Sequence, residues 1–245
     1  MSDPAAIRCE GVEKAFRHTR VLRGVTLEVR TGETLVLLGG SGSGKSVLLK
    51  HLNGLLRADR GTVVVEGQAL GALGEDALVP IRRRLGMLFQ GGALFDSLTA
   101  GDNVAFPLRE HRVVPESDVP GRVAEALGMV GLEGSERLMP AELSGGMRKR
   151  AALARALVLQ PRVLLYDEPT TGLDPVVAAR INHLIRDLQR RLGLTGVVVT
   201  HDLHSAFLVA DRIAFLHDGR IRFCGTPDEA RAAADPALHE FLTAA

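Results

Sequence analysis

The chain has 245 residues and a formal net charge of +1. This length suits one large α/β domain with a modest insertion, and the charge balance argues against a nucleic-acid partner. No apolar run approaches the roughly 18–20 residues that span a bilayer, and residues 1–6 lack the charged and apolar regions of a signal peptide, so we expect a cytosolic protein whose membrane role comes through a partner.

The first part of the chain carries the pattern of an α/β core. Residues 25–29 alternate apolar and polar side chains, which predicts a strand with one buried face. The continuous apolar run 34–38 ends in glycines and predicts a central strand covered on both faces. Residues 46–52 predict a helix that stops at the Asn-Gly pair that follows. Residues 85–89 predict another buried strand.

The pattern then changes and later returns. Residues 98–159 have helical spacing interrupted by prolines and show no convincing strand, which indicates a helical subdomain inserted into the core. Buried strands are predicted at 163–166 and 197–200, with a helix between them over residues 175–192. Residues 227–245 predict one or two short helices.

Two residue types are scarce. Cys9 and Cys224 lie in short apolar stretches that predict strands, so we interpret both as small buried hydrophobic residues and not as a disulfide or metal site. Of the 30 basic residues only four are lysines, at positions 14, 45, 50 and 149. A compact ammonium fits between phosphates where a planar guanidinium does not, so a lysine kept in such a chain is expected to serve a purpose that arginine cannot.

A glycine-rich loop lies between the apolar run 34–38 and the helix after it. It fits G-x-x-x-x-G-K-[ST] at every fixed position and comprises Gly39, Gly40, Ser41, Gly42, Ser43, Gly44, Lys45 and Ser46. Glycines let consecutive backbone N–H groups curl around an anion, and the helix N-terminus adds a positive dipole end. We expect Lys45 to reach the β- and γ-phosphates of ATP and the Ser46 hydroxyl to ligate Mg²⁺.

Two adjacent carboxylates end the apolar run 163–166. Ligands of open α/β sheets bind at the carboxyl ends of strands, which is where Asp167 and Glu168 are expected. Asp167 would hold the Mg²⁺ shell through a water, and Glu168 would orient or deprotonate the water that attacks the γ-phosphate. Two acids after a strand are weak by themselves, but together with the glycine-rich loop they predict an ATP-hydrolysing site.

A third segment narrows the type of ATPase. Ser144 can cap the helix that follows it, and Gly145 and Gly146 expose backbone N–H groups there. Three cations, residues 148–150, come next and oppose the helix macrodipole, a conflict that something anionic nearby would relieve. The alternative is a capped, solvated helix with a basic face.

With the segment Leu143-Ser144-Gly145-Gly146 in place, almost the whole sequence resembles the ATP-binding-cassette (ABC) ATPases. The resemblance implies an α/β fold: a RecA-like P-loop core with an antiparallel β subdomain and an inserted α-helical subdomain. It divides one domain, residues 1–245, into a catalytic core (1–97 and 160–225), a helical signature subdomain (98–159) and a short C-terminal helical tail (226–245).

The resemblance also implies a site shared between two copies of the chain. In this family the Leu-Ser-Gly-Gly signature contacts the γ-phosphate held by the other subunit of a head-to-tail dimer. Ser144, Gly145 and Gly146 would thus bind the ATP of the second copy. Asp174 fits the loop that crosses the dimer interface.

Three further positions match the family in order along the chain. Gln90 fits the loop that reaches Mg²⁺ and the attacking water, and it would act in catalysis together with Lys45. His201 fits the histidine that contacts the γ-phosphate. Phe16 falls where an aromatic ring stacks on adenine, with an ordinary strand residue as the alternative.

Finer features resemble the ATPases of Mce/Mla-type lipid transport systems. The matching segments are residues 86–98, 102–110, 143–150 and 166–175. Met147 and Gly172 replace the Gln and Ala that are common in the wider family. The resemblance implies a complex with integral-membrane permease chains and an Mce-domain lipid-binding protein, with this subunit peripheral on the cytoplasmic face of the inner membrane. The transported molecule would be a phospholipid.

Leu94 and Phe95 lie on a glycine-rich loop just after Gln90. Two bulky apolar side chains on a flexible loop suit a groove that receives a helix of the partner. The alternative is that both side chains belong to the core of the helical subdomain.

Other functions are weighed against lipid transport. An ATPase of an amino-acid or other small-solute importer would have identical core chemistry. A soluble cassette ATPase acting on DNA or ribosomes typically carries coiled-coil or zinc insertions or a second cassette, and this sequence shows none of them. A small-molecule kinase leaves the signature segment unexplained.

Overall fold

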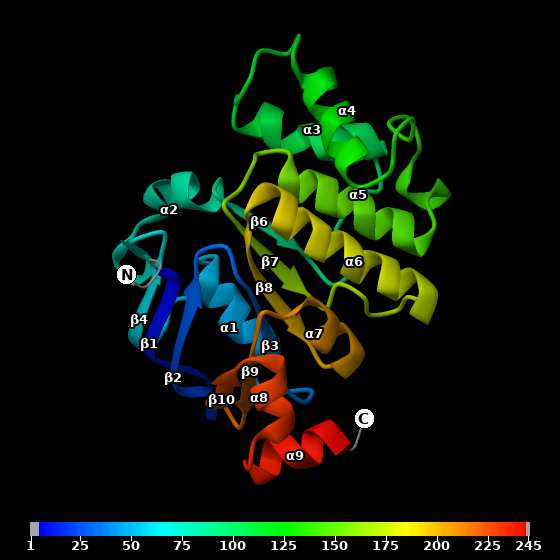
Figure 1. Ribbon diagram of the computed structural model, residues 1–245. Helices are drawn as coiled ribbons and strands as arrows, with labels where there is room; N and C mark the ends of the chain where they lie inside the picture. Colours follow the sequence, from blue (N-terminus) through cyan, green and yellow to red (C-terminus); the bar gives the residue numbers. More distant parts are fainter. Residues whose placement is uncertain (1–4, 244–245) are drawn as a thin grey trace.

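The structure, a computed structural model, describes residues 5–243 and contains two sheets and a block of helices (Figure 1). The larger sheet has six strands in the order β10-β9-β3-β8-β7-β6. They are β3 (Thr34–Leu38), β6 (Leu85–Leu88), β7 (Val163–Asp167), β8 (Thr195–Thr200), β9 (Arg212–His217) and β10 (Arg220–Gly225). Neighbours pair in parallel, apart from the antiparallel β9–β10 hairpin.

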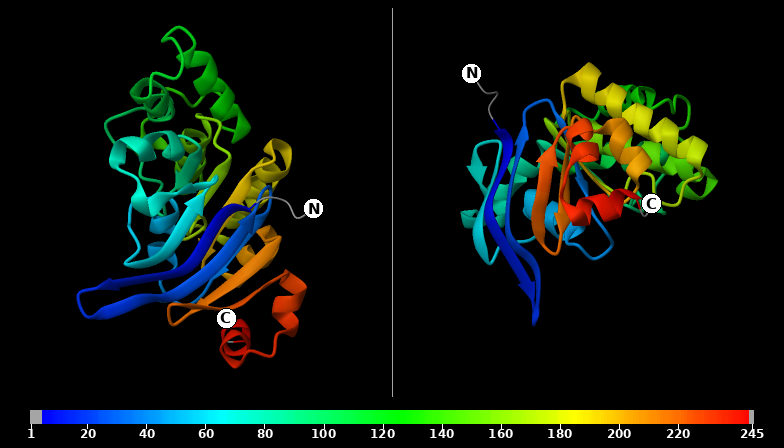
Figure 2. Two further views of the ribbon diagram at one scale, coloured as in Figure 1. Left: turned by 90° about the vertical axis from the view of Figure 1, so that its left-hand side faces the viewer. Right: turned by 60° about the horizontal axis from the view of Figure 1, so that its bottom comes forward.

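The smaller sheet is antiparallel and comes from the first third of the chain. Its order is β2-β1-β4-β5, with β1 (Ala5–Phe16), β2 (Thr19–Arg30), β4 (Arg60–Val65) and β5 (Gln68–Ala69). The β1–β2 hairpin is long and projects from the body of the molecule (Figure 2). A backbone hydrogen bond of 2.8 Å from Arg23 N to Gly219 O ties it to the larger sheet.

The helices separate into groups. Helix α1 (Lys45–Leu52) lies between the two sheets, whereas α3 (Ala100–Glu110), α4 (Val119–Met129) and α5 (Gly145–Leu157) form a block at the end opposite α9 (Figure 1). The others are α2 (Glu75–Arg82), α6 (Pro175–Leu192), α7 (Leu203–Val209), α8 (Pro227–Ala232) and α9 (Pro236–Thr243), with one-turn 3-10 helices η1 (Leu70–Ala72) and η2 (Pro140–Glu142). Within residues 5–243, none of the helices has both the length and the apolar character to cross a membrane.

Strand β3 separates two hydrophobic cores. Val36 and Leu38 pack with the helices from α3 to α7, and Leu35 and Leu37 pack with α1 and the antiparallel sheet. Successive side chains of a strand point to opposite faces, and all four are at most 1% exposed. The sheet is therefore covered on both faces, as its continuous apolar run predicts.

The expected α/β fold class is confirmed. Helix 175–192 and strand 34–38 have the predicted bounds, and the described residues 98–159 contain helices and no strand. Strands β4 and β9 were not predicted, although their apolar runs of three and four residues are as long as those that predicted β8 and β7. The subdomain boundaries stay predictions, and residues 1–4 and 244–245 of the outer segments lie outside the described residues.

The two cysteines differ in burial. Cys9 is 1% exposed in β1, as expected, but Cys224 is exposed in β10 and accepts a hydrogen bond of 3.0 Å from Arg212 Nη2. The prediction of a buried Cys224 is wrong. The physical reason is that β10 is an edge strand, and alternate residues along it face solvent.

Candidate functional site

The glycine-rich loop joins β3 to α1 at the carboxyl edge of the six-stranded sheet. Gly42 and Gly44 have φ angles of 77° and 107°, in the left-handed region where a side chain is strained. A Cβ on Gly39 would lie 2.3 Å from Leu216 O, too close for any side chain. The tight curl of the loop therefore requires glycine at these positions.

Lys45 is the cation of this loop. Its Nζ donates to Gly39 O at 2.7 Å and to Gly40 O at 3.0 Å, and the side chain is 7% exposed. Burial lowers the pKa of Lys45 from its usual value, and the nearby carboxylates of Glu168 and Asp167 oppose that shift. The loop thus encloses an ammonium that faces the ends of neighbouring strands.

Ser46, Asp167 and Gln90 supply oxygen atoms around the same space. Ser46 Oγ donates to Asp167 Oδ1 at 3.0 Å, which joins the start of α1 to the end of β7. Gln90 follows β6 and lines the cavity that Lys45 and Ser46 also line. Hydroxyl, carboxylate and amide oxygens are the hard ligands that Mg²⁺ prefers, so these residues fit a magnesium site.

Glu168 follows β7 in an unusual backbone conformation. Its φ angle is 48°, a left-handed value that is uncommon outside glycine and recurs at functional sites. The residue is 8% exposed. Its Oε1 lies 2.9 Å from His201 Nδ1, and its Oε2 accepts from Thr171 Oγ1 at 3.1 Å and Thr200 Oγ1 at 3.3 Å. Three side chains therefore fix the direction of this carboxylate.

These groups meet in one cavity of about 460 Å³. Its lining comprises Val21, Ser41, Gly42, Gly44, Lys45, Ser46, Val47, Gln90, Glu168 and His201. We call it the phosphate cavity. It lies where strands β3, β7 and β8 end, the usual place of ligands in open α/β sheets.

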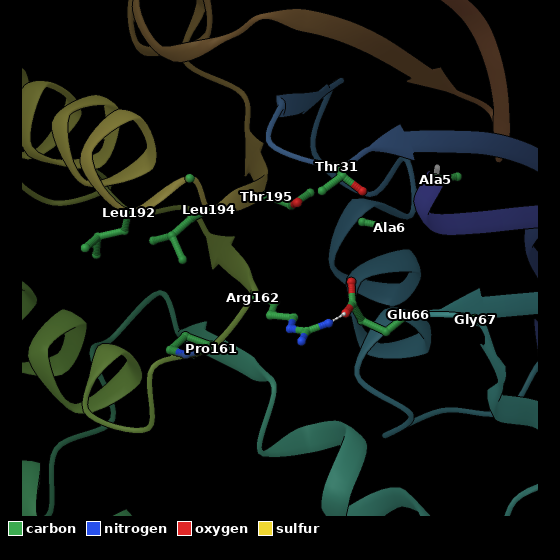
Figure 3. Close-up of a pocket in the computed structure, with 11 residues that line it drawn as sticks. Ala5, Ala6, Thr31, Glu66, Gly67, Pro161, Arg162, Leu192, Leu194 and Thr195 are labelled. Carbon is green, nitrogen blue, oxygen red and sulfur yellow. Dashed lines mark hydrogen bonds and ion pairs between the residues drawn. The ribbon is translucent and has the colours of Figure 1, made fainter. Parts of the chain in front are cut away.

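A second hollow, of about 570 Å³, lies at the opposite end of the sheet, where β7 and β8 begin (Figure 3). The Arg162 guanidinium points at the Glu66 carboxylate there, with a nitrogen–oxygen distance of 3.3 Å. These two charges satisfy each other, whereas the phosphate cavity combines a lysine, a histidine and an acid around a glycine loop. The smaller cavity is therefore the candidate site.

Phe16 is the last residue of β1 and is 42% exposed. Lys14 Nζ lies 5.6 Å from the centroid of its ring and is itself held by Asp59 Oδ1 at 2.7 Å and Arg57 O at 2.9 Å. The ring is thus open to a planar ligand, with a fixed cation beside it. Its stacking on adenine stays a prediction.

The signature residues lie apart from this cavity. Ser144 caps α5 by accepting a hydrogen bond of 3.2 Å from Met147 N, and a Cβ on Gly146 would lie 2.6 Å from Val177 Cγ1 of α6. Among the residues that the structure describes, the lining of the phosphate cavity includes none of the positions 144–146. Asp174 caps α6 beside them, accepting from Val176 and Val177 N.

The three cations after the signature donate hydrogen bonds to backbone carbonyls of the same chain. Arg148 Nη1 donates to Leu143 O at 2.7 Å, and Arg150 Nη1 donates to Gly131 O at 2.7 Å. Lys149 Nζ donates to Gln90 O and, at 3.4 Å, to Glu168 O. These carbonyls are neutral and leave the three positive charges in place, so an anion near the signature stays a prediction.

The loop after Gln90 is held more firmly than the sequence indicates. The buried Asn103 bonds Phe95 N at 2.7 Å and Phe95 O at 3.1 Å, and Arg155 donates to the carbonyls of Gly92 and Ala93. Leu94 packs against the core, but Phe95 is 44% exposed and its ring centroid lies 4.9 Å from that of Phe106. Leu94 is thus partly buried against the helical core, whereas Phe95 lies at the surface.

Sequence reasoning did not single out three residues of the site. Thr171 and Thr200 orient the Glu168 carboxylate, and Lys149 reaches the backbone of Glu168 and Gln90. A signal existed for Lys149, because it is one of only four lysines in an arginine-rich chain. No comparable signal marks the threonines.

The relatives that sequence comparison finds for this chain include ATP-binding proteins of transport systems. It is 44% identical over 237 residues to the probable ribonucleotide transport ATP-binding protein Mkl of Mycobacterium leprae, covering 97% of this chain and 68% of that protein. It is 40% identical to the intermembrane phospholipid transport system ATP-binding protein MlaF of Escherichia coli, covering 89% and 81%. It is 44% identical to the methionine import ATP-binding protein MetN of Mesorhizobium japonicum, covering 88% and 59%.

Solved structures and a family model agree with this placement. The dimeric ATP-binding cassette MJ0796, in a post-hydrolysis state bound to ADP and Pi, superposes with a TM-score of 0.82 at 33% identity, covering 90% of this chain and 98% of that one. Residues 22–171, more than half of the chain, match the family described as ABC transporter. The chain therefore belongs to the ABC transporter family, as one of its ATPase cassettes.

Proposed function

We propose that this cassette hydrolyses ATP at two composite sites formed when two copies of the chain pair head to tail. The observation that supports the pairing is the separation of the signature from the phosphate cavity. Ser144 and Gly146 line a different groove, between α4, α5 and α6. Backbone N–H groups at the start of a capped helix suit an anion, and a second copy would supply it.

Each residue of the phosphate cavity has a separate role in the proposed reaction. The loop amides and Lys45 would hold the phosphates of ATP, and Ser46, Gln90 and Asp167 would hold Mg²⁺. Bound Mg²⁺ supplies positive charge to the phosphate oxygens. Glu168 orients the attacking water and accepts its proton.

His201 has two roles in this scheme. Its Nδ1 meets Glu168 Oε1 at 2.9 Å, which leaves Nε2 on the other side of the ring to contact the γ-phosphate. Water attacks the γ-phosphorus as the bond to the β–γ bridging oxygen breaks, so the products are ADP and phosphate.

The substitution Glu168→Gln tests the shared site. It keeps the shape of the side chain and removes the base, so ATP should still bind while turnover falls by ~10²–10⁴, the range for a positioned general base. We expect ATP to hold two copies of this variant together, measured by light scattering after gel filtration. Adding Ser144→Arg should return the protein to a monomer. A double variant that still dimerises would refute the shared site.

We further propose that the transporter driven by this cassette moves a phospholipid. The support is the similarity to MlaF over 89% of the chain, together with the Mce/Mla-like segments of the sequence. The partners would be permease chains and an Mce-domain lipid-binding protein, with the cassette on the cytoplasmic face of the inner membrane. The similarity to MetN favours an importer of an amino acid as the second candidate.

Co-purification decides between these two candidates. A tagged copy of the chain, extracted from its native membranes with mild detergent, should bring down a permease and an Mce-domain protein. ATP turnover by that complex should rise with added phospholipid. A complex that contains a soluble amino-acid-binding protein and responds to methionine would refute lipid transport.

The surface for the permease is proposed to include Phe95 and Phe106, which form an exposed aromatic pair. Phe95→Asp should abolish co-purification of the permease while the melting temperature stays unchanged. Leu192→Asp is a matched control, because Leu192 is also 44% exposed but lies at the far end of α6. Equal loss in both variants, or in neither, would contradict this surface.

A further inference from the structure

Lys149 is a buried cation that the proposed reaction leaves without a role. It is 6% exposed, although it lies in the first turns of α5, directly after the signature. Burying an ammonium is costly unless strong hydrogen bonds compensate for the lost water. The role of Lys149 is therefore inferred from its hydrogen-bond partners.

The two partners of Lys149 are backbone carbonyls of residues in the phosphate cavity. Its Nζ donates to Gln90 O and, at 3.4 Å, to Glu168 O. Gln90 follows β6 and Glu168 follows β7, and these strands are neighbours in the sheet. One ammonium thus joins the two strand ends that carry the proposed catalytic side chains.

The hydrogen bond from Lys149 to Glu168 O matters because the backbone of Glu168 has an unusual conformation. With a φ angle of 48°, the residue occupies a conformation that persists only where its surroundings hold it. Its N–H donates to Val199 O at 2.9 Å, so β8 fixes one side of the residue. Lys149 fixes the other side through the carbonyl oxygen. The backbone of Glu168 is therefore held from both sides.

We propose that Lys149 is a positioning residue that links the signature helix to the hydrolytic edge of its own chain. Helix α5 begins at the signature, which contacts the nucleotide of the second copy, and four residues later Lys149 holds Glu168 and Gln90. Closure of the signature on one nucleotide would thus align the base that acts on the other. The inference rests on the proposed catalytic role of Glu168.

The test compares two substitutions of similar size. Lys149→Met fills the buried space without a hydrogen-bond donor, whereas Lys149→Gln restores an amide donor. We expect Lys149→Met to lower kcat by about 10²-fold, the effect of a misplaced catalytic group, with an unchanged Kd for ATP. Lys149→Gln should recover a large part of kcat, at a melting temperature equal to that of Lys149→Met. The split between kcat and Kd separates positioning from a loss of fold.

Arg122→Met is the matched control. Arg122 lies in α4 and also donates to a backbone carbonyl, Val158 O at 3.1 Å, which belongs to the helical block. The turnover of Arg122→Met should equal that of the wild type. Full turnover in Lys149→Met, equal losses in Lys149→Met and Arg122→Met, or no recovery in Lys149→Gln would overturn the inference.

Glu168→Gln measured in parallel keeps the two proposals apart. If Glu168→Gln lowers kcat while Lys149→Met leaves kcat unchanged, the link through Lys149 fails and the catalytic role of Glu168 stands. If Glu168→Gln turns over at the wild-type rate, the catalytic role fails and the inference falls with it.

Discussion

Replacing Phe16 by alanine should weaken the binding of ATP and ADP to the same extent. The ring stands at the end of β1 with 42% of its surface exposed, so its removal leaves no cavity in either core. Lys14 keeps its bonds to Asp59 and Arg57 when the ring is absent. The melting temperature should therefore hardly change, and only the affinity for the nucleotide should fall.

The expected size follows from the exposed area. A phenylalanine side chain offers about 200 Å², of which 42% is open to a ligand here. Covering these ~80 Å² with adenine at about 25 cal/mol per Å² contributes ~2 kcal/mol. This lies within the ~1–3 kcal/mol measured for a base stacked on an aromatic ring. The Kd for ATP should thus rise about 30-fold.

Isothermal titration with ATP and with ADP measures this effect directly. Phe95→Ala is a suitable control, because Phe95 is 44% exposed but lies on the loop after Gln90, away from the phosphate cavity. The reasoning is refuted if Phe16→Ala binds both nucleotides as the wild type does. It is also refuted if ATP binding weakens and ADP binding does not, because adenine is common to both.

Three further results are expected. Lys45→Ala should weaken ATP binding at least about tenfold, since a charged hydrogen bond contributes ~1.5–3 kcal/mol; undiminished affinity by titration would contradict the phosphate loop. Gly86→Ala should lower the stability to urea by ~1–3 kcal/mol, because its Cβ would lie 2.3 Å from Leu164 Cδ2 and 2.7 Å from Ala156 O; an unchanged midpoint would show that β6 can shift. Burial raises the pKa of both thiols, that of Cys9 to about 12, but only Cys224 is exposed, so at pH 8 maleimide should modify Cys224 slowly in the native protein and Cys9 only after unfolding, as mass spectrometry would show.

The sequence alone was sufficient for the parts of the site that are contiguous along the chain. The phosphate loop, the strand before it and the helix after it occupy residues 34–52, and their geometry depends on glycine, strand and helix preferences that act over a few residues. The apolar run before Asp167 and Glu168 predicts their strand for the same reason. The order of these elements was then enough to indicate an α/β fold, because parallel strands bring their carboxyl ends to one edge.

Contacts between distant segments were decided only by the tertiary structure. Lys149 lies 59 residues from Gln90, and nothing in the sequence around Lys149 indicates which carbonyls it meets. Every residue carries a carbonyl, so no sequence pattern can mark the one that a buried cation will find. The same limit applies to Leu94 and Phe95, which are adjacent and both apolar, yet Leu94 is partly buried against the helical core and Phe95 is exposed. Which side of a loop faces the core depends on where the rest of the chain lies, and that is a property of the whole fold.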